Sequence, residues 1–299
     1  MTLLRVGIIS RTFYYTPLWA ALKQRRFQKV GLDVQLTLIG PGDQAQMLRQ
    51  NLCQLTIAPP DGILQDVDSG GCCTILAGNC DRLSHCLIVQ PEIGSFADLR
   101  NKRIGVLSLT EGSFFHFRQL AKAHGMQFPE EFKVAETGGA PLRHGLLLEK
   151  KIDAGLQSFP WVHVAEQAGL RNLLDIGDYV PEWQFNTINA DLRWCDGHWT
   201  EVNAFLAVLA EATDWFYENR EGAAEVAAAQ MEVAQEMALR AWDYFARTGC
   251  LTRDMSINIR GLAKVHESLR ESKLLRGSQA DEPFAIERYF TGQVPMRGA

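Results

Sequence analysis

Short apolar runs alternate with segments of helical period along roughly the first 178 residues of the chain. The clearest case is the run 103–108 (RIGVLS), which a Ser/Thr/Gly turn separates from a segment of helical spacing at 114–124. This pattern predicts a strand, a turn and a helix, with Gly112 and Ser113 at the point where the helix begins.

The same pattern occurs twice. The run 5–10 (RVGIIS) repeats the residue types of 103–108, and similar segments follow each copy in the same order. Helices are predicted at 17–29, 44–51, 114–124 and 142–150, and further strands at 34–39, 55–58, 74–77, 132–135, 154–157 and 172–176. A repeat of two units, rather than three or more, predicts paired lobes and not a solenoid.

Alternation of strand and helix predicts an α/β protein in which each lobe is a mainly parallel sheet flanked by helices. The runs 85–91 and 185–190 are interpreted as two crossings between the lobes, which together form a hinge. The predicted lobes are therefore 1–88 plus 188–299 for lobe 1, and 89–187 for lobe 2. Beyond residue 190 the pattern predicts helices at 200–219, 221–230, 232–247 and 257–272, then a terminal segment, 282–296, packed on lobe 1.

Composition narrows the function classes. The chain has 299 residues, a net charge of -5 and no basic run interleaved with aromatics, so nucleic-acid binding is not indicated. No apolar stretch reaches the roughly 20 residues that cross a bilayer. The first strand begins without a signal peptide, and the seven cysteines are irregularly spaced. These features favour the cytoplasm if Met1 is the native start, or the periplasm if the chain is a mature form.

The turns beyond the carboxyl ends of the strands, including 137–140 and 158–161, are where parallel sheets bind ligands. The helix start at Gly112 and Ser113 offers N–H groups that suit an anion, although Ser113 or Thr110 could simply cap the helix. Flat apolar surface is available from four aromatic residues and positive charge from two arginines: Phe13, Tyr14, Phe114 and Trp161, with Arg11 and Arg82. The predicted ligand is a small anionic, aromatic or heterocyclic acid. The alternative is core packing for each aromatic and a solvated position for each arginine.

Several segments together resemble one family: 5–10, 31–34, 56–60, 151–154 and above all SFADLRNKRIGV at 95–106. They are similar to the NMT1/THI5-like solute-binding proteins of nitrate, sulfonate and taurine importers, which have the type II periplasmic-binding fold. The resemblance implies two lobes that close on a small ligand, delivery to an ABC permease, and no cofactor. It places these residues against the ligand: Thr12, Phe13, Asp43, Pro60, Asp61, Asp81, Arg82, Ser108, Glu111, Gly112, Ser113, Phe114, Ser158 and Trp161.

Two further hypotheses stay open. The first hypothesis is an enzyme, because some members of this superfamily are enzymes. It would be a cytosolic decarboxylase, desulfinase or pyrimidine-precursor synthase acting on such an acid. Weak catalytic candidates are Cys80, beside a cationic residue, and His116, one turn into the helix. A ligand sensor with a protein partner is the second. A metal site from Cys72, Cys73, Cys80, His85 and Cys86 is not favoured, because adjacent strand residues point to opposite faces.

Overall fold

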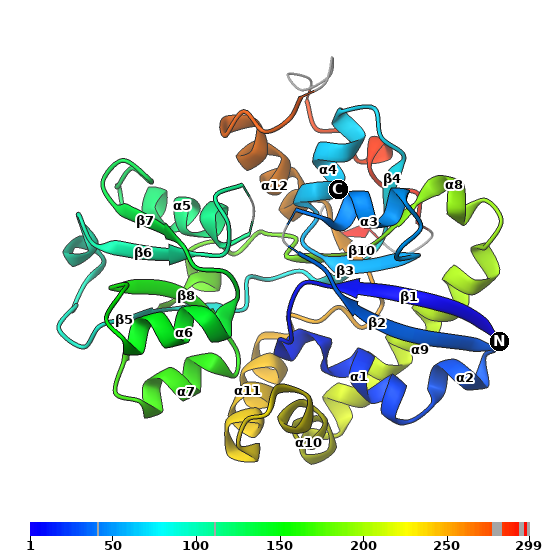
Figure 1. Ribbon diagram of the computed structural model, residues 1–299, viewed down its shortest axis with the longest axis horizontal. Coiled ribbons are helices and arrows are strands. Elements are labelled where there is room, and N and C mark those ends of the chain that lie inside the picture. Colours follow the sequence, from blue (N-terminus) through cyan, green and yellow to red (C-terminus); the bar gives the residue numbers. More distant parts are fainter. Residues whose placement is uncertain (41, 111, 277–282, 293–295, 298–299) are drawn as a thin grey trace.

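The computed structural model describes residues 1–40, 42–110, 112–276, 283–292 and 296–297. Two five-stranded sheets lie side by side, each flanked by helices, and two chain segments pass between them (Figure 1). The α/β architecture predicted from the sequence, with two mainly parallel sheets flanked by helices and two crossings between them, is confirmed.

The first sheet has the strand order β2-β1-β3-β10-β4. Its strands are β1 (Thr2–Ile8), β2 (Leu32–Leu38), β3 (Leu55–Ala58), β4 (Cys73–Cys80) and β10 (Asn186–Asp191). Strand β1 pairs in parallel with β2 and β3, whereas β10 pairs antiparallel with β3 and β4. Four strands therefore run in one direction, and the reversed strand comes from much later in the chain.

The second sheet has the order β7-β6-β8-β5-β9. Its strands are β5 (His85–Val89), β6 (Arg103–Val106), β7 (Lys133–Glu136), β8 (Ala154–Ser158) and β9 (Arg171–Asp175). Strand β6 pairs in parallel with β7 and β8, and β5 is the reversed strand between β8 and β9. This order matches the first sheet position by position.

The matched orders confirm the repeat seen in the sequence. Each copy contributes four strands to its own sheet and passes its next strand, β5 or β10, into the sheet of the other copy. The chain changes sheet between residues 80 and 85 and returns between 178 and 186. The bounds of the lobes as separately moving units remain a prediction.

Helices cover both faces of the sheets. They are α1 (Thr16–Lys23), α2 (Arg26–Lys29), α3 (Gln44–Arg49), α4 (Asp61–Asp68), α5 (Ser113–Ala123), α6 (Ala140–Leu148), α7 (Trp161–Gln167), α8 (Leu192–Cys195), α9 (Trp199–Glu218), α10 (Arg220–Met231), α11 (Gln235–Thr248) and α12 (Ile259–Glu271). Short 3-10 helices lie at Phe13–Tyr15, Phe96–Leu99, Ile176–Asp178 and Ile286–Arg288, and a small pair of strands joins β11 (Ile257–Asn258) to β12 (Met296–Arg297). The single helix predicted at 17–29 is wrong, because Arg25 adopts a φ of +55° and separates α1 from α2.

The C-terminal part packs on the first sheet. The backbone N–H of Ile75 in β4 donates to the carbonyl of Tyr289 over 2.7 Å. The buried carboxylate of Asp68, at the end of α4, accepts from the Tyr289 hydroxyl over 2.8 Å and pairs with Arg288. Residues 283–292 thereby cover the edge of this sheet, as the sequence predicted for the described part of 282–296.

Candidate functional site

A cavity lies between the two sheets, where the carboxyl ends of their parallel strands face each other. Its cavity volume is about 50 Å³, and the space between its atoms amounts to about 490 Å³ when the open solvent at its mouth is included. Its lining comes from both halves of the chain: Ile9, Ser10, Thr12, Tyr14, Pro59, His85, Leu107, Gly112, Ser113, His116, Gly139, Ala140, Arg143, Ser158 and Phe185. The reversed strands β5 and β10 begin at the edge where the others end, so His85 and Phe185 reach the cavity from the crossings.

Arg143 places a buried positive charge on this cavity. Its side chain, 3% exposed, rises from the first turns of α6. One terminal nitrogen, Nη1, donates to the carbonyl of Gly138 over 2.9 Å, and Nε has no hydrogen-bond partner among the described residues. Burial lowers the pKa of Arg143 to about 10, which leaves the group protonated at neutral pH.

Glycines make room for this arginine. Gly105 in β6 and Gly155 in β8 are paired across the second sheet. A Cβ atom on Gly155 would lie 2.7 Å from Cδ of Arg143, and one on Gly105 would lie 3.3 Å from the same atom. Side chains at these two positions would push the arginine stem away from the sheet, so the pair of glycines determines where the guanidinium lies.

Two buried histidines form the wall beside Arg143. The rings of His85 and His116 lie 5.8 Å apart, and each ring is within 5.6 Å of the Phe185 ring. Burial first, and then the Arg143 charge, lowers the pKa of His116 to about 3, and burial also lowers the pKa of His85 well below its ordinary value. Both rings are therefore neutral at pH 7, and neither Nδ1 atom has a partner among the described residues.

The start of α5 lies on the cavity, as the sequence predicted. Gly112 adopts a φ of +62°, which favours glycine, and the Ser113 hydroxyl accepts the N–H of Leu107 over 2.7 Å. However, the carboxyl group of Asp61 from α4 also faces this start. Burial raises the pKa of Asp61 to about 6, while its own N–H and that of Gly112 act in the lowering direction. The Asp61 carboxyl group therefore lies close to the Gly112 amide, although neither of its buried oxygens has a hydrogen-bond partner among the described residues.

The structure brings part of the predicted set together on the cavity. These residues are Thr12, Tyr14, Gly112, Ser113 and Ser158, with His116 from the weak catalytic candidates. The Ser158 hydroxyl is buried and has no partner within the described part of the chain. Burial raises the pKa of Tyr14, so its phenol stays protonated.

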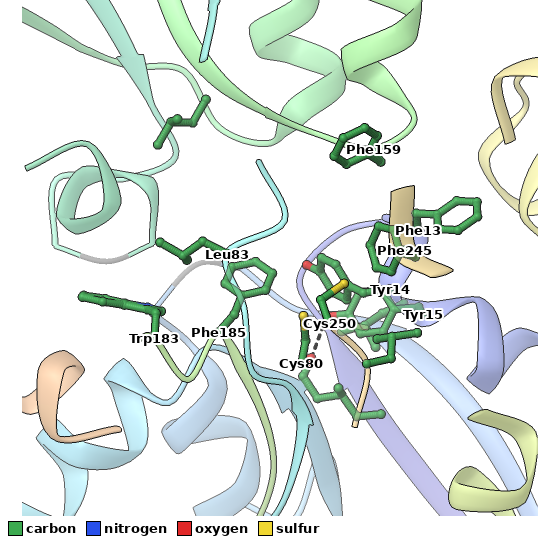
Figure 2. Packing of buried hydrophobic residues seen from close by; sticks show 14 of the residues in the cluster. Phe13, Tyr14, Tyr15, Cys80, Leu83, Phe159, Trp183, Phe185, Phe245 and Cys250 are labelled. Atoms are coloured by element: carbon green, nitrogen blue, oxygen red, sulfur yellow. Dashed lines mark hydrogen bonds between the residues drawn. The ribbon is translucent and has the colours of Figure 1, made fainter. Parts of the chain in front are cut away.

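The other three residues of the predicted aromatic surface lie off the cavity. Phe13 packs in the core against Phe216 and Phe245, at ring distances of 5.9 and 5.1 Å, as Figure 2 shows for Phe245. Phe114 contacts Phe115 and Phe128. The Trp161 ring packs 5.4 Å from His144. None of these three predicted residues lines the cavity.

The predicted arginines also lie off the cavity. Arg11 is exposed, and its guanidinium donates to the carbonyl of Gln230 over 3.3 Å. Arg82 pairs with Asp178 at 2.8 Å and donates to the carbonyl of Gly177, so its charge serves contacts within the structure. Arg143 supplies the cavity's charge instead.

The remaining predicted residues fall into three groups. Asp43, Pro60, Asp61, Asp81 and Ser108 do not line the cavity, although Asp61 faces its Gly112 wall. Glu111 lies outside the described residues. Cys80 is fully buried, and burial raises the pKa of its thiol well above the ordinary value, so the thiol is not activated.

Nine lining residues were not among the predicted ones: Ile9, Ser10, Pro59, His85, Leu107, Gly139, Ala140, Arg143 and Phe185. The signal for Arg143 in the sequence was its place just after the turn 137–140, whereas the two glycines opposite it are brought together only by the fold. His85 and Phe185 begin the runs interpreted only as crossings, and a reversed strand at that position is not visible in local periodicity.

Metal and membrane features were searched over the described ranges. Among those residues, no group of three or more His, Cys, Asp or Glu side chains could hold a metal ion. None of the helices that the structure describes has the length and apolar character needed to cross a bilayer.

Comparison with known proteins confirms the type II periplasmic-binding fold that the sequence predicted. The sequence profile of the family described as NMT1/THI5 like matches residues 12–223. The periplasmic aliphatic sulphonate binding protein SsuA from Escherichia coli superposes with a TM-score of 0.77 at 14% identity, covering 100% of this chain and 95% of that one. SsuA from Xanthomonas axonopodis pv. citri bound to MOPS gives 0.76 at 14%, with coverages of 92% and 95%. The desulfurization enzyme DSZB gives 0.66 at 15%, with coverages of 98% and 97%. No curated protein matches the chain.

Proposed function

Because the chain belongs to the NMT1/THI5-like family, we propose that it is a solute-binding protein of an ABC importer. In this proposal it captures a small organic acid anion, aromatic or heterocyclic, in the cleft between two lobes and delivers it to a permease. The observation that carries the proposal is the cavity between the two sheets, lined from both and holding one buried cation, Arg143. The sulfonate carriers that share the fold support it.

The cavity is suited to binding and release. Three of its polar groups, Ser158, His85 and His116, are neutral at pH 7 and can form hydrogen bonds with a ligand without transfer of a proton. Closure around the ligand removes water, and each polar contact then contributes more than it would at a surface. We propose that the predicted residues lining the cavity, Thr12, Tyr14, Gly112, Ser113 and Ser158, contact the ligand.

An enzyme on the same fold is the second candidate, supported by the overall likeness to DSZB. It would be a decarboxylase, desulfinase or pyrimidine-precursor synthase acting on the same kind of acid. The local chemistry favours the carrier. Cys80 is a buried, protonated thiol off the cavity, and a His116 pKa of about 3 makes the ring a weak proton acceptor at neutral pH.

Binding without turnover tests the proposal. The purified chain is screened by thermal shift against aryl carboxylates, small sulfonates and pyrimidines, and each hit is followed by calorimetry and by product analysis. A carrier is expected to bind one hit at a 1:1 ratio, to become more compact in solution scattering, and to return the compound unchanged. Conversion of the hit into product would establish the enzyme instead, and the absence of any hit would contradict the proposed ligand class.

A salt bridge between α11 and α7, which belong to different predicted lobes, should contribute little to closure. Arg240 in α11 pairs with Glu166 in α7 at 2.9 Å, and both side chains are partly exposed, at 44% and 29%. Such pairs are worth about 0.2 to 1 kcal/mol, so Arg240→Gln is expected to weaken binding of the best hit less than about fivefold. Calorimetry at low and high salt measures this. A loss of tenfold or more would show that this pair, and not the cavity, dominates closure.

A further inference from the structure

The charge balance of the cavity points to a more specific ligand class. Arg143 is the only charged residue among the described residues that line it. Its guanidinium is buried, burial is the only cause acting on its pKa, and no described acidic side chain forms an ion pair with it. A buried cation without a counter-charge is unfavourable, so the site gains most from a ligand that brings one negative charge.

The backbone N–H groups at the start of α5 are less available to a negatively charged ligand group. The buried carboxyl group of Asp61 lies close to the Gly112 amide, so a ligand anion placed there would lie close to a second acid group. Nε of Arg143, in contrast, has no partner among the described residues. The guanidinium edge is therefore the better partner for a charged oxygen.

Aromatic rings and hydrogen-bonding groups lie beside Arg143. The rings of His85, His116 and Phe185 lie within 5.0 to 5.8 Å of one another and are tilted by 48 to 85°, so they form an aromatic cluster at the cavity. The Nδ1 atoms of both histidines and the Ser158 hydroxyl lack partners among the described residues, although each side chain is more than nine-tenths buried. A ring that carries hydrogen-bonding atoms would satisfy these groups.

We propose, on the basis of the proposed function, that Arg143 binds the acid group of the ligand. The cavity then selects a flat ring that carries one singly charged acid group. Carboxylate and sulfonate share this chemistry. A neutral ring would leave the guanidinium without a counter-charge. A phosphate dianion would bring one negative charge more than the lining balances, beside two neutral histidines.

Four matched probes test this inference by calorimetry at pH 8: benzoate, benzenesulfonate, benzamide and phenyl phosphate, which is then mostly doubly charged. Benzoate or benzenesulfonate is expected to bind at least about tenfold more tightly than benzamide and phenyl phosphate, as for a charge-assisted hydrogen bond. Comparison of the two acids identifies which acid group is preferred. Equal binding of benzamide, preference for phenyl phosphate, or no binding of any probe would each overturn the inference.

Variants assign the selectivity to Arg143. Arg143→Gln is expected to weaken binding of the acid about 10- to 100-fold and to leave benzamide binding unchanged. Arg143→Lys should keep the preference for an acid with lower affinity, because a lysine retains the charge but not the planar donor edge. Circular dichroism and thermal melting check that each variant folds, and the wild-type probe series decides the matter if neither does. Undiminished acid binding by a folded Arg143→Gln would refute the assignment.

The outcomes separate this inference from the proposed function. An acid that binds through Arg143 and is then consumed overturns the carrier function and leaves the charge selectivity standing. A ligand that is returned unchanged and binds equally well to Arg143→Gln overturns the selectivity and leaves the carrier function standing.

Discussion

Gly155→Ala is expected to weaken binding of the best ring acid about 10- to 100-fold and to lower the free energy of unfolding by about 1 to 3 kcal/mol. The added Cβ would lie 2.7 Å from Cδ of Arg143 and 3.3 Å from the backbone oxygen of Gly105. The backbone of β8 is hydrogen-bonded on both sides, so the arginine stem must move. Calorimetry and urea unfolding measure the two effects.

Gly145→Ala is the matched control, because Gly145 lies in α6, the same helix as Arg143, and has open space where a Cβ would go. Alanine there should leave ligand affinity unchanged and raise the free energy of unfolding by about 0.5 to 1 kcal/mol, as alanine is the better helix former. If Gly155→Ala binds the acid as tightly as the wild type does, the glycine pair does not position the guanidinium.

Asp61→Asn is expected to raise the free energy of unfolding at pH 7.5 by up to about 3 kcal/mol. Burial raises the pKa of Asp61 from 3.8 to about 6, so the folded protein holds this proton more tightly than the unfolded chain does. For this group, stability is therefore greatest below about pH 4 and declines as the pH rises towards and past 6. Asparagine is neutral at every pH and has nearly the same size and shape as aspartate.

Urea unfolding at pH 4.5, 5.5, 6.5 and 7.5 measures this effect. The difference between Asp61→Asn and the wild type should be about a third of its full size at pH 4.5 and reach nearly its full size at pH 6.5 and above. Asp196→Asn, at an exposed position, should show no such trend. A variant that is less stable than the wild type at pH 7.5 would mean that the ionised carboxylate holds the two halves together.

Local pattern was sufficient for most of the fold. The paired runs 5–10 and 103–108 predicted the two strands β1 and β6, and the duplicated order of segments predicted the matching sheets. These features depend on side-chain period and turn residues within about 20 positions. The break at Arg25 was missed because a single left-handed residue leaves no mark in the period.

Prediction of the site residues required contacts between distant parts of the chain as well as local pattern. Thr12, Tyr14, Gly112, Ser113 and Ser158 follow strand ends directly, and for them position along the chain was enough to predict a place on the cavity. Whether an arginine next to such a turn faces the cavity depends on what packs around it. Arg82 pairs with Asp178 and donates to the carbonyl of Gly177, about 95 residues later in the chain. Arg11 donates to the carbonyl of Gln230.

The sequence by itself therefore determined that a duplicated α/β unit forms two lobes and that a helix begins at Gly112 on the cleft. Only the tertiary structure decided which side chains meet there. Reversed strands from the opposite half bring His85 and Phe185 to the edge, and two glycines in adjacent strands direct Arg143 to it. The physical reason is that hydrophobic period reports which face of an element is buried, whereas the cavity is made by contacts between elements far apart in the chain.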